Sequence, residues 1–320
     1  MGSLMLSEDE VARIARLAES AAERHRGGNS TVSRVKWDGI DVAVKDYSAR
    51  ADAGARITRE SKALALLSAS EAALAPQPLG FSMQLGIGVQ SWLPGAKADT
   101  TAETLDFMLH CMVALHALSN SPLAENALPA ADAIASAADL SGQVHARLEA
   151  LRHAQGGLAI QPQCDAIELA AGGLDVAKVD HPVMTLSPSD FGPHNIMTDR
   201  NSDRWWLIDL EFFGWDDAHK LVCDTLMHPL LDWSRINAET FVAAATDAYG
   251  LDEDRLWQLM PWSALKWGTI VLGRAARCFQ AGNGQGAQEA FIAADRYRRL
   301  AIASLTARRN GFVALVSWEL

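Results

Sequence analysis

The first fifty residues alternate between a helical and an extended pattern of hydrophobic positions. After a capping box of Ser7 and Glu10, apolar residues recur at helical spacing from Val11 onward, which predicts a first helix ending near residue 24. Residues 26–47 then contain two runs of strand-forming residues joined by Asp-Gly. This arrangement predicts a strand, a tight turn and a second antiparallel strand.

The pattern changes after a Pro-Gly break that follows residue 93. Before the break, the Ala-rich segment 52–69 has helical periodicity and precedes two short strands. After the break nearly every segment has a helical pattern, apart from a hairpin region at 183–210. The chain is therefore expected to be α+β with two lobes: a small lobe of antiparallel sheet plus helix (residues 1–93) and a larger, mainly helical lobe (residues 94–320).

The turn TLSPSDFGPHNIM contains an acid, Asp190, and an amide, Asn195, five positions apart. The segments 196–197 and 205–208 flank a polar stretch and are expected to pair as an antiparallel hairpin. Counting the register back from residues 199 and 204, which flank the hairpin turn, places Asn195 opposite Asp209 at the open end of the hairpin, next to Asp190.

Amide and carboxylate oxygens that converge in this way are hard donors, of the kind that hold Mg²⁺ together with substrate phosphates. In this interpretation Asn195 and Asp209 bind the metal, and Asp190 orients an attacking hydroxyl. The alternative is that Asp190 caps a turn and Asp209 forms a hydrogen-bonded strand end. The D-x-x-x-x-N spacing alone does not separate the two interpretations.

The strand VAVK and the helix after it contain a second candidate pair. Ala43 and Lys45 share one face of the strand, and the small alanine leaves room for a flat ligand. Glu60 lies on the same apolar helical stripe as Ile57 and Leu64. A carboxylate on a buried stripe needs a cation, and Lys45 is the expected partner. The alternative is a solvated lysine on an edge strand and a glutamate at the margin of the stripe.

Composition limits the class of protein. The formal net charge of −11 argues against nucleic acid as the main partner, because phosphate binding needs a basic face. The four cysteines lie far apart without CxxC spacing, which favours reduced thiols. Neither a membrane span nor a signal peptide is evident, so a cytoplasmic protein is expected. The sequence contains no signal for an oligomeric state.

Taken in order, the motifs VAVK, SDFGPHN and IDLE resemble those of the aminoglycoside phosphotransferase and choline kinase family, which has a protein-kinase-like fold. The resemblance covers roughly residues 20–230, and the ordered set is more specific than any one motif. It implies a small-molecule kinase that uses ATP or GTP with Mg²⁺ and phosphorylates a hydroxyl of a metabolite, an amino alcohol or an aminoglycoside-like acceptor.

The resemblance also implies roles for individual residues. It implies that Lys45, held in place by Glu60, contacts the nucleotide's α- and β-phosphates. It also implies that Asp190 is the catalytic base and that Asn195 and Asp209 bind the metal. The segment RGGNSTVSRV resembles the nucleotide-positioning loop, with Gly27, Gly28, Asn29 and Ser30 approaching phosphate. QSWLPG resembles the hinge, with Gln90 in the gatekeeper place and backbone groups of Ser91 and Leu93 facing the purine.

One position departs from the family pattern. Members usually have His two residues before the catalytic Asp, whereas this chain has Pro188 there. The absent His shapes the loop, so the departure favours an alternative function as a non-catalytic nucleotide-binding module. His194 precedes Asn195 and could touch substrate, although a structural role is favoured for it.

Overall fold

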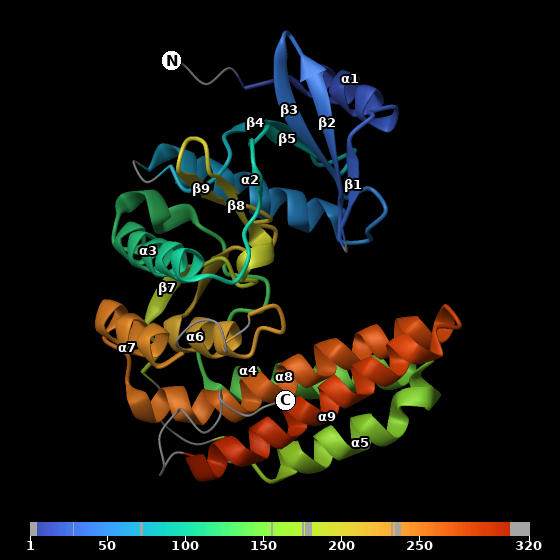
Figure 1. The fold of residues 1–320 in the computed structure, drawn as a ribbon, viewed down its shortest axis with the longest axis vertical. Coiled ribbons are helices and arrows are strands. Elements are labelled where there is room, and N and C mark those ends of the chain that lie inside the picture. Colours follow the sequence, from blue (N-terminus) through green and yellow to red (C-terminus); the bar gives the residue numbers. More distant parts are fainter. Residues whose placement is uncertain are drawn as a thin grey trace.

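The computed structural model describes residues 5–27, 29–70, 73–154, 156–174, 176, 181–231, 233 and 238–307. The chain forms an upper lobe built on a sheet and a lower lobe of packed helices (Figure 1). The class is α+β, as the sequence predicted. The elements of the upper lobe are α1 (Glu8–Glu19), β1 (Arg24–Arg26), β2 (Thr31–Trp37), β3 (Ile40–Asp46), α2 (Ala53–Ala69), β4 (Pro78–Ser82) and β5 (Ile87–Ser91).

The upper sheet is antiparallel, with strand order β1-β2-β3-β5-β4. The β2–β3 hairpin turns at Asp38 and Gly39, whose φ angles of 46° and 82° match the left-handed turn that an Asp-Gly pair favours. The first helix ends at Glu19, earlier than expected. Residues 20–23 form a turn and bends instead, and Arg24 begins an additional strand, Arg24–Arg26, that pairs with β2.

The two helices of this lobe contact different faces of the sheet. Val11 and Ile14 of α1 form a small core with Val42, Val44 and neighbouring apolar residues of the strands. Side chains alternate along a strand, so Lys45 points to the opposite face, where it meets α2. One face of the sheet therefore packs an apolar core against α1, and the other presents a charged group to α2.

The lower lobe is mainly helical. Its elements are β6 (Ala96–Lys97), α3 (Ala102–Ser119), η1 (Pro122–Asn126), α4 (Ala137–His153), α5 (Gly157–Gly172), β7 (Met184–Ser187), η2 (Pro193–Asn195), β8 (Ile196–Asp199), β9 (Arg204–Leu207), β10 (Gly214–Asp217), α6 (Ala218–Leu226), α7 (Ala238–Tyr249), α8 (Glu253–Gln280) and α9 (Gly284–Ala307). The long helix α8 packs against α4, α5, α6 and α9 (Figure 1). None of the helices, over the described residues, is long and apolar enough to cross a membrane.

Two short sheets in the lower lobe position the turn of residues 185–197, which contains Asp190 and Asn195. The β8–β9 hairpin pairs Ile196 with Leu207, which is the register predicted from the sequence. Strand β10 pairs with β7 and was not anticipated, since its four residues have no alternating pattern and pair only through tertiary contact. The loop that contains Asp190 leaves β7 and enters β8, so both of its ends are anchored in sheets.

A buried charge cluster joins α6 to α8. Asp224 accepts hydrogen bonds from Ser263 (2.5 Å) and from Lys266, and Lys220 lies 3.4 Å from the same carboxylate. Burial alone would raise the pKa of Asp224, but the two lysines outweigh it and hold the pKa below its ordinary value. The carboxylate therefore stays ionised and neutralises cations that have no access to water.

Replacing Asp224 tests how strongly this cluster holds the helices together. Asp224→Asn leaves Lys266 as a buried charge without its carboxylate, and we expect a loss of about 3–5 kcal/mol in unfolding free energy. Urea denaturation measures it. The control is Asp295→Asn, which breaks a largely solvated pair with Arg298 and should cost less than about 1 kcal/mol. Equal effects of the two substitutions would contradict the role of the cluster.

Candidate active site

Lys45 lies between acids from both lobes. Its Nζ is 2.6 Å from Glu60 Oε1 on α2 and 2.7 Å from Asp209 Oδ1, which follows β9 in the lower lobe. The Tyr47 hydroxyl donates to the other Glu60 oxygen at 2.9 Å. The structure thus places Glu60 next to Lys45, the neighbour that the helical stripe had indicated.

The protonation state of Lys45 follows from these contacts. Its side chain is only 5% exposed, and burial by itself would lower its pKa. The carboxylates of Glu60 and Asp209 outweigh burial and raise the pKa above its ordinary value. Lys45 is therefore a permanent cation at the boundary between the lobes.

Backbone strain marks the Asp209 segment, which contacts this cation, and the loop that contains Asp190. Ser189 and Asp209 both have positive φ angles, 64° and 61°, which are uncommon for residues with a side chain. The Ser189 hydroxyl donates to the Phe212 carbonyl at 3.2 Å, which ties the two loops together. Conformations of this kind cost about 1–3 kcal/mol each and occur preferentially at functional sites.

Donors surround the Asp190 carboxylate, whose side chain is 33% exposed. His228 Nε2 lies 3.2 Å from Oδ1, and Oδ2 receives His194 Nε2 at 3.3 Å and Asn195 Nδ2 at 3.2 Å. Burial would raise the pKa of Asp190, but the hydrogen bonds from the two histidines outweigh it and hold the pKa well below its ordinary value. Asp190 is therefore a carboxylate with a fixed orientation.

Asn195 connects Asp190 to the segment that contains Asp209. Its side-chain nitrogen also donates to the Asp190 carbonyl at 3.0 Å, so the side-chain oxygen is left as an acceptor. Its backbone carbonyl accepts the Ile208 N–H at 2.9 Å. Asp209 is the next residue, and 36% of its side chain is exposed. The backbone of Asn195 therefore pairs with Ile208, one residue before the Asp209 that the sequence placed opposite it.

The loop between β1 and β2 reaches across to the lower lobe. Asn29 Nδ2 donates to Glu211 Oε1 at 2.6 Å, and Arg56 Nη1 on α2 lies 2.5 Å from the same oxygen. Glu211 is fully buried, and burial followed by the nearby Asp209 charge raises its pKa. Gly27 donates its N–H to the Ser30 carbonyl at 2.8 Å, while Gly28 lies outside the described residues.

The candidate hinge residues lie at the C-terminal end of β5 and just after it. Gln90 pairs with Ala43 across β3 and β5, and both side chains are buried. The Ser91 N–H donates to the Gln77 carbonyl at 2.9 Å, so its own carbonyl is the group that could face a purine. Leu93 follows the strand, and among the described residues none accepts its N–H.

Three residues of this site were missed from the sequence: Arg56, Glu211 and His228. Arg56 lies one helical turn before Glu60 and is buried like it, so the same stripe argument could have found it. Glu211 stands two positions after Asp209, a spacing that gave no separate signal. His228 is 38 positions from Asp190, and no sequence pattern connects the two.

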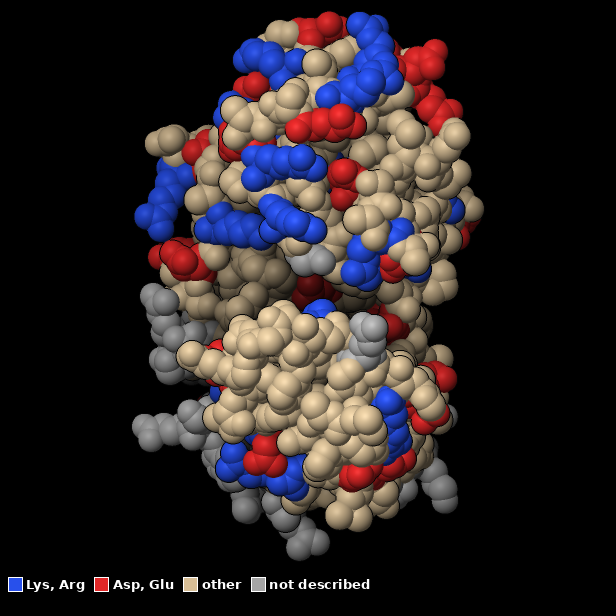
Figure 2. Space-filling view, turned by 90° about the vertical axis from the view of Figure 1, so that its right-hand side faces the viewer, with Lys and Arg blue, Asp and Glu red and all other residues tan. Residues whose placement is uncertain are grey.

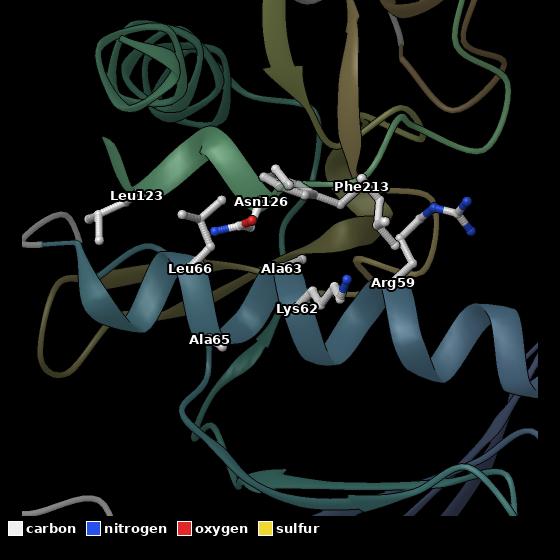
Figure 3. Close-up of a pocket in the computed structure, with 10 residues that line it drawn as sticks. Arg59, Lys62, Ala63, Ala65, Leu66, Leu123, Asn126 and Phe213 are labelled. Carbon is white, nitrogen blue, oxygen red and sulfur yellow. The ribbon is translucent and has the colours of Figure 1, made fainter. Parts of the chain in front are cut away.

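The surface supports the placement of the site between the lobes. Figure 2 shows a hollow between the upper and lower lobes with acidic side chains inside it and Lys and Arg side chains on the upper lobe above. A separate cavity of about 220 Å³ lies between α2 and η1 (Figure 3). It is lined by Ala63, Leu66, Leu123 and Phe213 with Arg59 and Lys62, and contains none of the acids described above.

Residues 21–260 match the model of the phosphotransferase enzyme family APH, which is three quarters of the chain. The chain belongs to this family. None of the curated proteins matches the sequence of this phosphotransferase at a significant level.

Solved structures match over nearly the whole length of this phosphotransferase. A proposed aminoglycoside phosphotransferase from Ralstonia eutropha JMP134 is 13% identical with a TM-score of 0.64, covering 95% of this chain and 98% of its own. The choline kinase LicA from Streptococcus pneumoniae is 16% identical (TM-score 0.57; coverage 92% and 99%). Spectinomycin phosphotransferase APH(9)-Ia, solved with ADP and spectinomycin, is 12% identical (TM-score 0.53; coverage 92% and 98%). The fold is therefore the two-lobed, protein-kinase-like fold that the sequence predicted.

The contact between Glu211 and Arg56 can be tested in this phosphotransferase against a matched surface arginine. Arg56 contacts two acids and the Phe212 ring; Arg34 likewise contacts two acids and the Trp92 ring, but is exposed. Arg56→Met leaves the buried Glu211 without its cation and should lower the unfolding free energy by about 3–5 kcal/mol.

Arg34→Met is the control and should leave the unfolding free energy almost unchanged, because exposed ion pairs contribute little. Thermal and urea unfolding of both variants measure the difference. An Arg56→Met variant as stable as Arg34→Met would contradict the assignment of Arg56 as the partner of Glu211.

Proposed function

We propose that this phosphotransferase is a small-molecule kinase that transfers the γ-phosphate of ATP or GTP to a hydroxyl group. The acceptor class is a metabolite, an amino alcohol or an aminoglycoside-like compound. The observation that supports it most is the cation Lys45, which Glu60 holds against Asp209, while a hydrogen bond from Ser189 to Phe212 ties the Asp190 loop to the Asp209 segment. Phosphoryl transfer needs placement and charge neutralisation more than covalent help from the protein.

The proposed nucleotide site belongs to the upper lobe, residues 1–93, and the acceptor site to residues 94–320. In this arrangement Lys45 binds the α- and β-phosphates and Glu60 holds it in place. The purine lies against Ala43, next to the backbone of Ser91 and Leu93, with Gln90 as gatekeeper. The loop of Gly27, Gly28, Asn29 and Ser30 covers the phosphates with backbone N–H groups.

Asn195 and Asp209 fit a magnesium ion by their donor chemistry. The side-chain oxygen of Asn195 and the carboxylate of Asp209 are hard oxygen ligands, and the exposed third of Asp209 leaves positions for phosphate oxygens. Bound Mg²⁺ would neutralise charge on the phosphates. In the structure Asp209 contacts Lys45, so binding of the nucleotide requires Asp209 to exchange that cation for the metal.

Asp190 is the proposed catalytic base. Its fixed carboxylate would accept a hydrogen bond from the acceptor hydroxyl and hold the oxygen in line with the γ-phosphate. As the new O–P bond forms and the bond to the leaving nucleoside diphosphate breaks, the hydroxyl proton passes to Asp190. The low pKa of Asp190 agrees with a base that mainly orients the hydroxyl and takes the proton late.

The structural neighbours support an acceptor that contains both hydroxyl and amino groups. One neighbour is named a choline kinase, and another was solved with spectinomycin. The acidic side chains within the hollow suit a cationic acceptor. A transfer assay over a panel of amino alcohols, aminoglycosides and sugars tests this class.

The rival function is a non-catalytic nucleotide-binding module, which Pro188 favoured. The contacts of Asp190 count against it, because two histidines and an asparagine still hold the carboxylate. Nucleotide binding without transfer or hydrolysis for any acceptor in the panel would support the rival.

Asp190→Ala separates the base from nucleotide binding. We expect turnover to fall by about 10²- to 10⁴-fold, because proton acceptance and orientation are lost, while nucleotide affinity is nearly intact. Steady-state kinetics and calorimetry with a nucleotide measure both. Asp203→Ala, in the exposed turn between β8 and β9, is the control and should change neither. An equal loss of turnover and affinity in Asp190→Ala would contradict its role.

Asp209→Asn tests the metal site. The substitution removes a charged ligand, so nucleotide affinity measured with Mg²⁺ should fall by about tenfold or more. Without Mg²⁺ the affinity should not fall, because the carboxylate that competes with phosphate for Lys45 is gone. Calorimetry with and without Mg²⁺ measures both. A loss of the same size under both conditions would show that Asp209 acts other than through metal.

A further inference from the structure

His228 is a buried histidine that points at the Asp190 carboxylate from outside its loop. Its side chain is 4% exposed, and Nε2 lies 3.2 Å from Asp190 Oδ1. It follows α6, 38 positions after Asp190, and therefore reaches the loop only through tertiary packing. The edge-on ring of Trp267, with its centroid 5.0 Å away, restricts rotation of the imidazole.

The tautomer of His228 follows from its other nitrogen. The backbone N–H of Leu230 donates to His228 Nδ1 at 3.2 Å, so Nδ1 must offer a lone pair. A neutral imidazole has a single N–H, which then resides on Nε2 and points at Asp190. The Leu230 backbone thus fixes His228 as a hydrogen-bond donor to the carboxylate.

His194 completes a pair on the same carboxylate. Its Nε2 lies 3.3 Å from Oδ2, and its ring stacks on His228 with centroids 4.8 Å apart and 22° between planes. Gly192 makes room for this stack, since a Cβ there would come within 3.0 Å of an atom of each ring. Gly192 has an extended backbone, so glycine is needed here for space and not for its dihedral angles.

We propose that His228 and His194 are positioning residues that hold the Asp190 carboxylate toward the acceptor hydroxyl and replace the loop histidine that Pro188 lacks. Each donates to a different oxygen, so together they fix the rotation of the carboxylate about its Cβ–Cγ bond. This inference rests on the proposed kinase function for its catalytic consequence. The hydrogen-bonding arrangement itself can be tested without activity.

The same three side chains have donor atoms that could hold a transition metal, since all lie within 4.8 Å of one another. Metal binding at His228 Nε2 would need the proton to move to Nδ1. There it would face the Leu230 N–H, and two donors would oppose each other. The tautomer therefore favours a hydrogen-bonded cluster over a metal site.

Paired substitutions test the catalytic part. His228→Leu removes the donor, and we expect kcat to fall about 10- to 100-fold with an unchanged KM for nucleotide. His228→Gln keeps an N–H near the Nε2 position and should recover much of the loss. His194→Leu and His194→Gln repeat the comparison on a less buried ring, in case His228→Leu fails to fold.

Two further variants calibrate the result. Gly192→Ala places a Cβ within 3.0 Å of an atom of each ring and displaces both rings, so it should lower kcat as His228→Leu does. His153→Leu removes an exposed histidine of α4 and should leave kcat unchanged. Leucine and glutamine variants with equal kcat, or a loss that appears in the nucleotide KM, would overturn the positioning role.

Side-chain ¹⁵N spectra of histidine test the arrangement independently of catalysis. We expect His228 to show a protonated Nε2 and an unprotonated Nδ1 at neutral pH, and added Zn²⁺ at equimolar concentration to leave both signals unchanged. An Nδ1-protonated His228, or stoichiometric Zn²⁺ shifts on both histidines, would overturn the inference. If the spectra agree but no acceptor is phosphorylated, the kinase proposal fails and the hydrogen-bonded arrangement stands.

Discussion

The arrangement of the site depends on one buried cation shared by the two lobes. Lys45 comes from the upper sheet, Glu60 from α2 and Asp209 from the lower lobe, and their side chains meet within 2.7 Å. Glu60 could not be held there as a carboxylate without the lysine, because a buried carboxylate without a cation is strongly unfavourable. The Lys45–Glu60 ion pair holds α2 against the sheet, and the Lys45–Asp209 ion pair holds the sheet against the lower lobe.

A second set of contacts closes the lobes around the same point. Glu211 lies two residues after the strained Asp209. It accepts a hydrogen bond from Asn29 of the β1–β2 loop and one from Arg56 of α2. The two acids on this short segment therefore bind partners from three separate elements of the upper lobe. In the proposed kinase a nucleotide bound at Lys45 would replace the Lys45–Asp209 contact, so the interaction that joins the lobes in the free protein would be the one that the substrate exchanges.

Local patterns in the sequence located what depends on periodicity. Glu60 was found from a helical stripe, and the β8–β9 register from the turn that sets it, because both follow from neighbours along the chain. Glu211 with Asn29 and His228 with Asp190 are 182 and 38 positions apart and have no repeat or spacing to reveal them. Strands β1 and β10 form only because they pair with β2 and β7, so no local pattern in the sequence predicts them. The roles given to the nucleotide, metal and base residues remain predictions.

The most direct test of this account is a crystal structure of the protein with Mg²⁺ and a non-hydrolysable ATP analogue. Lys45 should keep its contact with Glu60 and exchange Asp209 for phosphate oxygens, while Asp209 and Asn195 share the metal and Asp190 faces the γ-phosphate. A nucleotide bound elsewhere, or bound with the Lys45–Asp209 contact still closed, would contradict the central claim.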